Sequence, residues 1–172
     1  LIDKNKTWVD DKNATDPSYF ENLAKGQKPK FIWIGCSDSR FSPELITKSD
    51  LGEIFVLRNI ANQFNTTDLN ALSVLKYAIE YLEVRQIIVC GHYKCGGINA
   101  SINNCGHGVI DHWLQSINEI YLSNKLQLDD KSEKERENLL SELNIKKQVQ
   151  NISTTSIVQD AWNKDFADTG NG

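Results

Sequence analysis

Residues 87–97 read Ile-Ile-Val-Cys-Gly-His-Tyr-Lys-Cys-Gly-Gly. The apolar, β-branched run that stops at Gly91 is typical of a strand buried on both faces. His92 and Cys95 follow at once, and an imidazole and a thiolate three residues apart can bind one zinc ion. Two ligands do not complete a site, so the rest of the chain must supply a third.

Other interpretations of this stretch stay open. A histidine and a cysteine at this spacing, taken alone, are often unrelated core or surface residues. A redox Cys-x-x-Cys motif is excluded because position 92 is histidine. Cys90 lies inside the apolar run, which favours a packed core thiol.

A second apolar run, Phe-Ile-Trp-Ile-Gly-Cys at 31–36, predicts another strand and delivers Cys36 to its end. In open α/β sheets, functional groups gather at the carboxyl ends of the strands. If the two strands are parallel neighbours, Cys36, His92 and Cys95 meet. The sequence therefore favours a zinc site with two sulfur ligands and one nitrogen ligand.

The whole chain alternates strands with helices, which predicts an α/β fold with a mostly parallel central sheet flanked by helices. A third strand is expected at 53–57. We expect a single domain over 1–172, with a polar N-terminal arm at 1–15 and a polar tail at 165–172. The helices are expected at 16–24, 43–49, 69–83, 96–104, 109–127, 131–142 and 145–163, the last with an interruption near 153–155.

Composition limits the functional classes. The 172 residues are 40% hydrophobic and 24% charged, with a net charge of −4. A mildly acidic chain favours neither nucleic acid nor an anionic membrane as its partner. We find no apolar run of membrane-spanning length and no signal-peptide core, and we expect a cytoplasmic protein. The four cysteines then favour free or metal-bound thiols over disulfides.

The role of the zinc depends on a fourth ligand. A structural site would be closed by another side chain, whereas a catalytic site leaves that position open, and there zinc lowers the pKa of water to about 7. The candidates for a fourth side chain are Cys105, His107, His112 and Asp38. Asp38 and Arg40 could instead orient a reacting hydroxide, or they could form an ordinary surface pair, which contributes little.

Two separated segments decide between these alternatives. Cys36-Ser-Asp-Ser-Arg40 together with His92-Tyr-Lys-Cys95-Gly-Gly97 resembles the paired signature of the β-class carbonic anhydrases. The resemblance covers roughly residues 16–163. It includes Gln27-x-Pro29-x-Phe31, Gly52-Glu-x-Phe55, Arg58-Asn-Ile-Ala-Asn62 and Tyr77-Ala78.

The resemblance implies an activity and roles for matching residues. Members of the family interconvert carbon dioxide and bicarbonate. Cys36, His92 and Cys95 would bind one Zn²⁺ per chain, and Asp38, held by Arg40, would orient zinc hydroxide. The substrate pocket would be lined by Gln27, Phe55, Ile60, Tyr77 and the backbone of Gly96, with some of these residues reached across the interface of a homodimer or a dimer of dimers.

A regulated subgroup, called type II, is also suggested. Trp33, Gly35 and Arg58 resemble the residues of a separate bicarbonate site that switches the enzyme off, although Trp33 is equally consistent with simple strand packing. In the closed state of that subgroup, Asp38 leaves Arg40 and becomes the fourth zinc ligand. Phe41 stands where a smaller apolar residue is common, and its ring would obstruct the bicarbonate site.

The chain departs from the family pattern at its ends. Family members continue past Trp162 with a further edge strand, which we expect to be missing here, and the usual N-terminal arm is shortened. The alternative function is therefore a truncated zinc-binding structural or interaction protein with little turnover. An enzyme of the same fold acting on a sulfur analogue such as carbon disulfide is a third reading.

Overall fold

The three predicted strands form one parallel sheet in the computed structural model, which describes residues 1–103, 106 and 108–169. The strands are β1 (Phe31–Cys36), β2 (Ile54–Asn59) and β3 (Gln86–Cys90), in the order β2-β1-β3. Both pairings are parallel, with Cys36 opposite Asn59 and Gly35 opposite Cys90. The α/β prediction is confirmed, and within the described ranges no further strand joins β3.

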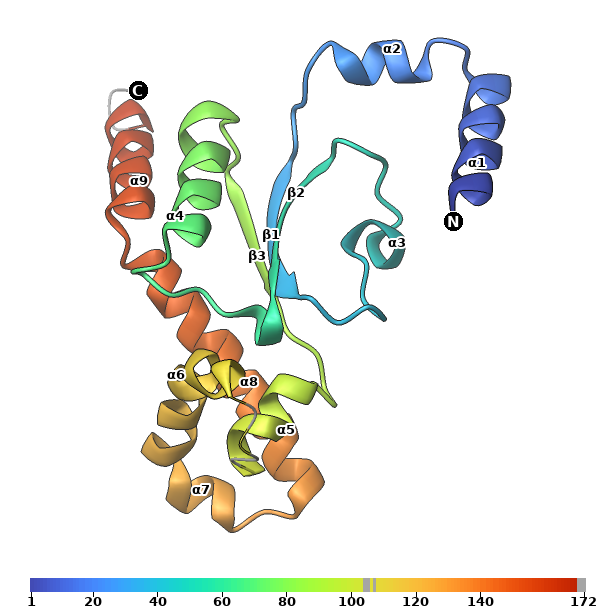
Figure 1. Cartoon of the computed structure of the whole chain (residues 1–172). Helices are drawn as coiled ribbons and strands as arrows, with labels where there is room; N and C mark the ends of the chain where they lie inside the picture. The colour runs from blue at the N-terminus through green and yellow to red at the C-terminus, as the bar shows by residue number, and fades with distance from the viewer. Residues whose placement is uncertain (104–105, 107, 170–172) are drawn as a thin grey trace.

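Helices cover the sheet and extend beyond its carboxyl end (Figure 1). Ile32 and Ile34 of β1 are fully buried and share a core with Leu75 and Val158. The helical elements are α1 (Ile2–Thr15), α2 (Tyr19–Ala24), α3 (Pro43–Thr47), the 3-10 turn η1 (Ile60–Asn62), α4 (Leu69–Lys76), the π-helical turn η2 (Tyr77–Tyr81), α5 (Gly96–Asn103), α6 (Val109–Ser123), α7 (Lys125–Asp129), α8 (Glu133–Ser153) and α9 (Ser156–Thr169).

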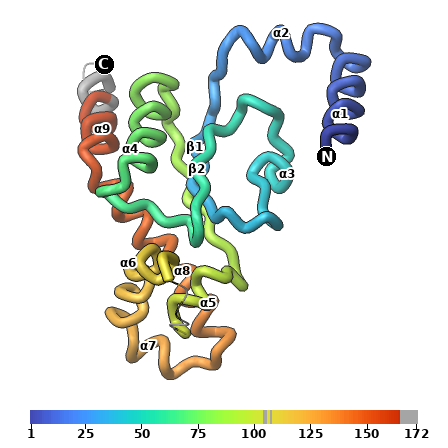
Figure 2. The backbone as a smooth tube through the Cα atoms, in the orientation of Figure 1, coloured from blue at the N-terminus to red at the C-terminus, as the bar shows by residue number. Residues whose placement is uncertain are grey.

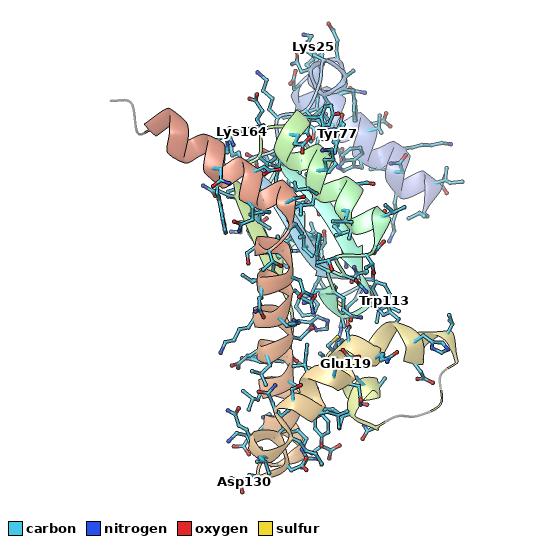
Figure 3. The ribbon with its side chains drawn as sticks, turned by 90° about the vertical axis from the view of Figure 1, so that its left-hand side faces the viewer. Lys25, Tyr77, Trp113, Glu119, Asp130 and Lys164 are labelled. Atoms are coloured by element: carbon cyan, nitrogen blue, oxygen red, sulfur yellow. The ribbon has the colours of Figure 1, made fainter. Side chains whose placement is uncertain are left out.

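The views show how these helices divide. In Figure 1, α4 and α9 lie on one side of the sheet and α3 on the other, while α5, α6 and α7 gather beyond the carboxyl ends of the strands. The tube in Figure 2 shows α1 far from the sheet, joined to it through α2. Figure 3 shows α8 as a long helix that runs from the sheet toward Asp130, with α6 beside it.

The N-terminal elements differ from the prediction. Residues 2–15 form α1, which the polar sequence did not suggest and which buries none of its side chains. The predicted helix at 16–24 starts later, at Tyr19, because Asp16 caps the end of α1 in an extended conformation. Its carboxylate accepts a hydrogen bond from the backbone of Ser18, which makes a turn between the two helices.

The helix boundaries of the C-terminal half also need correction. The predicted helix 109–127 breaks at Asn124, whose side chain donates to the carbonyl oxygen of Ile120. The predicted helix 131–142 and the first part of the predicted helix 145–163 are instead one helix, α8, which begins at a Ser132–Glu135 capping box, and the rest of the second predicted helix lies in α9. The interruption near 153–155 is confirmed.

The polar tail and the long helix at 69–83 differ as well. The backbone of α9 continues to Thr169, so residues 165–169 of the polar tail are helical, and 170–172 lie outside the described residues. The predicted helix at 69–83 changes to π-helical geometry at Tyr77. Among the described residues, no helix combines the length and apolar character needed to cross a bilayer.

Candidate metal centre

The structure brings Cys36, His92 and Cys95 together, as the strand order predicts. Their ligand atoms all lie within 4.8 Å of one another, and the two sulfur atoms are 3.9 Å apart. Cys36 ends β1, and His92 and Cys95 follow β3, the neighbouring parallel strand. Cys95 is only 3% exposed, so the cluster is closed on its inner side.

The imidazole of His92 is oriented for a metal. Its Nδ1 lies 3.0 Å from the carbonyl oxygen of Tyr93, and donation to that oxygen leaves the lone pair on Nε2. Nε2 is buried and has no hydrogen-bond partner among the residues that the structure describes. A buried lone pair facing two thiols is what a zinc site requires. The donor set therefore fits zinc.

The two thiols interact strongly. The Cys95 thiol donates a hydrogen bond to Cys36 and, with the backbone N–H groups of Asp38 and Ala61, lowers the pKa of Cys36 to about 4 against the opposing effect of burial. The same hydrogen bond and burial raise the pKa of Cys95. The pair therefore holds one thiolate near neutral pH, and a cation must displace the second proton to gain both sulfur ligands.

Asp38 and Arg40 form a bidentate pair beside the cluster. Arg40 Nε donates to Oδ1 at 2.9 Å and Nη2 donates to Oδ2 at 2.6 Å, while the backbone N–H of Arg40 also donates to Oδ1. These bonds hold the pKa of Asp38 well below its usual range. Asp38 Oδ2 lies 3.8 Å from His92 Nε2, so the carboxylate faces the cluster. This placement distinguishes the pair from an isolated surface ion pair.

The residues of the suggested bicarbonate site support the same loop. Arg58 donates from Nε to the carbonyl oxygen of Cys36 at 2.8 Å and from Nη2 to that of Asp38 at 2.7 Å. The indole of Trp33 lies over Gly35, where a Cβ would come within 2.3 Å of Trp33 Nε1. Trp33 thus also has a packing role in β1.

Phe41 lies directly beside the metal cluster. Its ring and that of His92 have centroids 4.4 Å apart and planes tilted by 32°. The phenyl ring therefore covers one face of the imidazole. This contact restricts rotation of the imidazole and limits access to it from that side.

The expected pocket residues divide between the two ends of the sheet. Ile60 lies at the cluster end, where its Cγ2 would be 3.0 Å from a Cβ on Gly97, and Gly96 follows Cys95. Phe55 stands opposite Ile32, four residues and about 13 Å along β1 from Cys36. Tyr77 packs on Phe55, with ring centroids 5.8 Å apart.

Gln27 belongs to the same distant group. It lies in the exposed linker before Phe31, at the amino end of β1. One chain therefore does not bring Gln27, Phe55 and Tyr77 to the metal cluster.

The remaining histidines and cysteines lie apart from the cluster or cannot be placed. His112 is exposed on α6. Cys105 and His107 lie outside the described residues. Cys90 is half-buried, and burial raises the pKa of its thiol. Of the four candidates for a fourth ligand, Asp38 is the one that the structure places beside the cluster.

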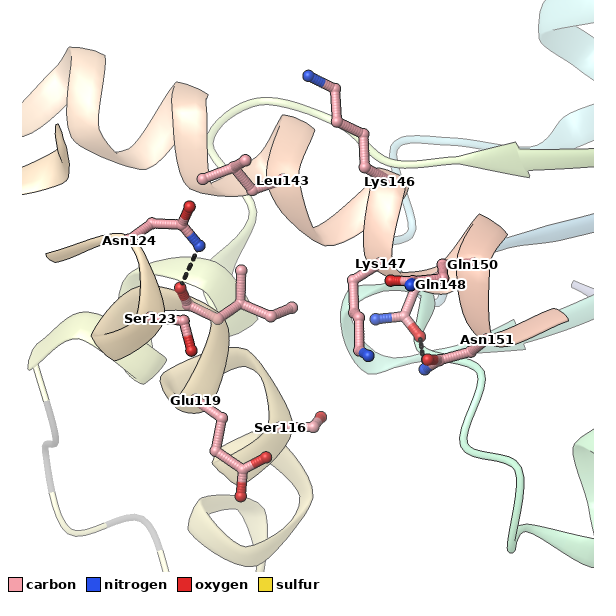
Figure 4. Close-up of a pocket in the computed structure, with 11 residues that line it drawn as sticks. Ser116, Glu119, Ser123, Asn124, Leu143, Lys146, Lys147, Gln148, Gln150 and Asn151 are labelled. Atoms are coloured by element: carbon pink, nitrogen blue, oxygen red, sulfur yellow. Dashed lines mark hydrogen bonds between the residues drawn. The ribbon is translucent and has the colours of Figure 1, made fainter. Parts of the chain in front are cut away.

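A cavity of about 460 Å³ lies elsewhere, between α6 and α8 (Figure 4). Polar side chains line it, among them Ser116, Glu119, Lys147 and Asn151. None of the three candidate metal ligands lines it, so this cavity is separate from the candidate metal site.

Sequence reasoning missed one set of residues near the site. Amide side chains of α8, two of them buried, hydrogen-bond to the loop that follows β2, at Ala61 to Phe64. Asn144, Gln148 and Asn151 have the i, i+4, i+7 spacing of one helix face, which is a readable signal. It was overlooked because polar residues on a charge-rich helix suggest a solvated face.

Comparison with known proteins identifies the family. Residues 31–168 match the family model described as Carbonic anhydrase. The solved structure of a Coccomyxa β-carbonic anhydrase in complex with acetazolamide is 36% identical, with a TM-score of 0.91 over 95% of this chain and 75% of that chain. The chain belongs to the β-carbonic anhydrase family.

Other carbonic anhydrases are similar over nearly the whole chain. A carbonic anhydrase of Emericella nidulans is 40% identical over 163 residues, which are 94% of this chain and 72% of that protein. One of two tetrameric β-carbonic anhydrases from Sordaria macrospora is 34% identical, with a TM-score of 0.92 over 98% of this chain and 85% of that chain. Family membership makes this chain a carbonic anhydrase enzyme, with its candidate metal ligands at the positions that the two sequence motifs indicated.

Proposed function

We propose that this β-carbonic anhydrase catalyses the zinc-dependent, reversible hydration of carbon dioxide to bicarbonate and a proton. The observation that carries the proposal is the buried cluster of Cys36, His92 and Cys95 with the Asp38–Arg40 pair at its edge. These three side chains would hold one Zn²⁺ per chain. Zinc, when bound, supplies a Lewis acid that ionises water near neutral pH.

Asp38 is the proposed catalytic carboxylate. Held ionised by Arg40, it can accept a hydrogen bond from the attacking oxygen and turn the lone pair of that oxygen toward the substrate. Arg40 keeps the carboxylate in one orientation through two side-chain bonds. It also donates to the carbonyl oxygen of Lys94, which ties this orientation to the loop carrying His92 and Cys95.

The substrate pocket is proposed to be completed by a second copy of the chain. Ile60 and Gly96 lie beside the metal cluster, whereas Gln27, Phe55 and Tyr77 do not. A partner could supply these three residues, so that apolar rings receive the neutral gas and the glutamine amide contacts the product anion. The tetrameric relatives from Sordaria macrospora support a homodimer or dimer of dimers.

Bicarbonate inhibition of the type II kind is proposed for the loop that carries Asp38. Arg58 holds the carbonyl oxygens of Cys36 and Asp38, so an anion that recruits the guanidinium would release this loop. Asp38 could then leave Arg40 and become the fourth ligand. Trp33 and Gly35 are the other residues assigned to this site, and Phe41 restricts the space beside it.

Stopped-flow hydration of carbon dioxide tests the enzymatic proposal. We expect zinc-loaded protein to turn over, Cys36→Ser to lose both zinc and activity, and Asp38→Ala to keep zinc but lose about 100-fold in rate. Cys90→Ser is the matched control, because its thiol lies outside the cluster, and it should retain both. One zinc per chain with no hydration would instead support the structural role.

The cytoplasmic location and the single domain over 1–172 stay predictions.

A further inference from the structure

Three amide side chains of α8 form a continuous hydrogen-bonded row against the loop after β2. Asn144 Nδ2 donates to the carbonyl oxygen of Ala61 at 3.0 Å, and Asn151 Nδ2 donates to that of Phe64 at 3.0 Å. Between them, Gln148 Oε1 accepts from the backbone N–H of Phe64 at 2.8 Å. Figure 4 shows Gln148 and Asn151 joined where the row borders the cavity.

The row fixes the direction of the Asn144 amide. Gln148 Nε2 donates to Asn144 Oδ1 at 2.8 Å, so the oxygen of Asn144 is occupied and its NH₂ group must face Ala61. Asn144 is only 1% exposed. A buried amide is costly unless its hydrogen bonds are made, and here both ends are satisfied by one arrangement. The contact with Ala61 is therefore specific.

The loop that Asn144 holds has an unfavourable backbone. Ala61 has φ 62° and ψ 33°, and Asn62 has φ 46°, although neither residue is glycine. Left-handed backbone at two successive L-residues persists only where the surroundings impose it. The bond from Asn144 to the carbonyl oxygen of Ala61 is one restraint that imposes it.

Ala61 in turn lies against the metal cluster. It is fully buried in the same apolar group as Cys36 and Cys95. A Cβ on Gly97 would be 3.0 Å from the Ala61 methyl, so the residue also packs tightly on the first turn of α5. Gly97 is two residues after Cys95, so the position of Ala61 bears on the segment that carries this thiol.

We propose that Asn144 is a positioning residue for the metal centre: it holds Ala61 in its left-handed conformation, and Ala61 packs on Gly97 within the apolar group that contains Cys36 and Cys95. The inference rests on the proposed metal-binding function of this cluster. Contacts outside the ligand set that orient the ligands typically change metal affinity by about 10- to 100-fold when they are lost. Asn144 touches neither the metal ligands nor the substrate.

The test uses Asn144→Leu, which keeps the volume but removes the amide. We expect about tenfold faster loss of Zn²⁺ to a chelator and a shifted sulfur-to-metal charge-transfer band in the Co²⁺-loaded protein. Ser141→Ala is the matched control, because Ser141 is buried on the same helix but bonds within it, to the carbonyl oxygen of Glu137. It should leave both measurements unchanged.

A second change separates positioning from general damage. Glycine adopts the left-handed conformation without strain, so adding Ala61→Gly to Asn144→Leu should move the Co²⁺ band back toward the wild-type position. If Asn144→Leu does not fold, Gln148→Glu removes the donor that orients Asn144, and it should shift the band in the same direction.

The outcomes separate this inference from the proposed function. Suppose that folded Asn144→Leu and Gln148→Glu lose Zn²⁺ at the rate of the unmodified protein and show the same Co²⁺ band, while the unmodified protein hydrates carbon dioxide. That result would overturn the role of Asn144 and leave the enzyme proposal standing. A wild-type protein that binds neither Zn²⁺ nor Co²⁺ at Cys36 would overturn both.

Discussion

At the scale of single residues, Asp38 shows what sequence reasoning reaches and where it stops. The spacing of Asp38 and Arg40 allowed either a surface pair or a catalytic carboxylate. The structure shows a bidentate pair whose carboxylate lies 3.8 Å from His92 Nε2. Sequence spacing shows that Asp38 and Arg40 can pair, but only the folded loop determines how far the pair lies from the cluster.

The first prediction concerns the titration of Asp38. Because Arg40 lowers the pKa of Asp38, the pair stabilises the folded chain above the ordinary aspartate pKa of about 3.9, and this contribution is lost as pH falls through the lowered value. In Arg40→Gln we expect the Asp38 pKa to rise toward its ordinary value. Carboxyl-carbon NMR on metal-free protein measures both, and equal pKa values in the two proteins would contradict the assigned role of Arg40.

The proposed metal ligands could be predicted from the sequence because their residue types are chemically distinctive and their meeting follows from the strand order. The left-handed turn at Ala61 could not be predicted, because alanine has no preference for that conformation and the restraint comes from Asn144, 83 residues away. The residues around Ala61 in the sequence carry no sign of this contact, and the spacing of the amides on α8 does not name the residue that they hold.

At the scale of elements, β1 is the strand that carries the site. Its neighbours on both sides fix the register of Cys36, and Trp33 covers Gly35 immediately before it. The strands were predictable because apolar β-branched runs are strong signals. The interruption near 153–155 was also predicted, whereas the break at Asn124 was not, because it depends on a local hydrogen bond. The helix α1 was not predicted either, because it has no buried face to produce a pattern.

The second prediction tests β1. In Gly35→Ala the new methyl group would lie 2.3 Å from Trp33 Nε1, so the indole must move. We expect a loss of about 1–3 kcal/mol in the free energy of unfolding, as for other overpacked sites. Gly96→Ala is the control for stability, because no heavy atom lies within 4 Å of its Cβ position. Urea unfolding measures both, and equal stabilities would show that Trp33 does not constrain this strand.

At the scale of the whole molecule, the pocket residues are separated by the length of the sheet. Phe55, Tyr77 and Tyr81 form a row of rings, with Tyr77 and Tyr81 stacked at 5.4 Å. Tyr81 is 68% exposed, so the row ends at the surface. An exposed aromatic row is typical of a protein interface, and we assign this one to the second copy proposed above.

The third prediction tests that assembly. A charge at the end of the ring row should be incompatible with a buried interface, so Tyr81→Arg should lower the oligomeric mass and reduce hydration about tenfold or more. Leu126→Arg, at an exposed apolar position on α7, is the control and should change neither the oligomeric mass nor the hydration rate. Light scattering with stopped-flow hydration measures both, and a fully active monomer would show that one chain completes its own pocket.

The ligand environment of bound zinc, measured by X-ray absorption at the zinc edge on the purified protein, tests the central claim most directly. We expect one zinc per chain with two sulfur ligands at about 2.3 Å and two lighter ligands. Cys36→Ser should remove one sulfur from that environment or the zinc itself. A folded protein that holds no zinc, or holds it without sulfur, would contradict the metal centre and the function built on it.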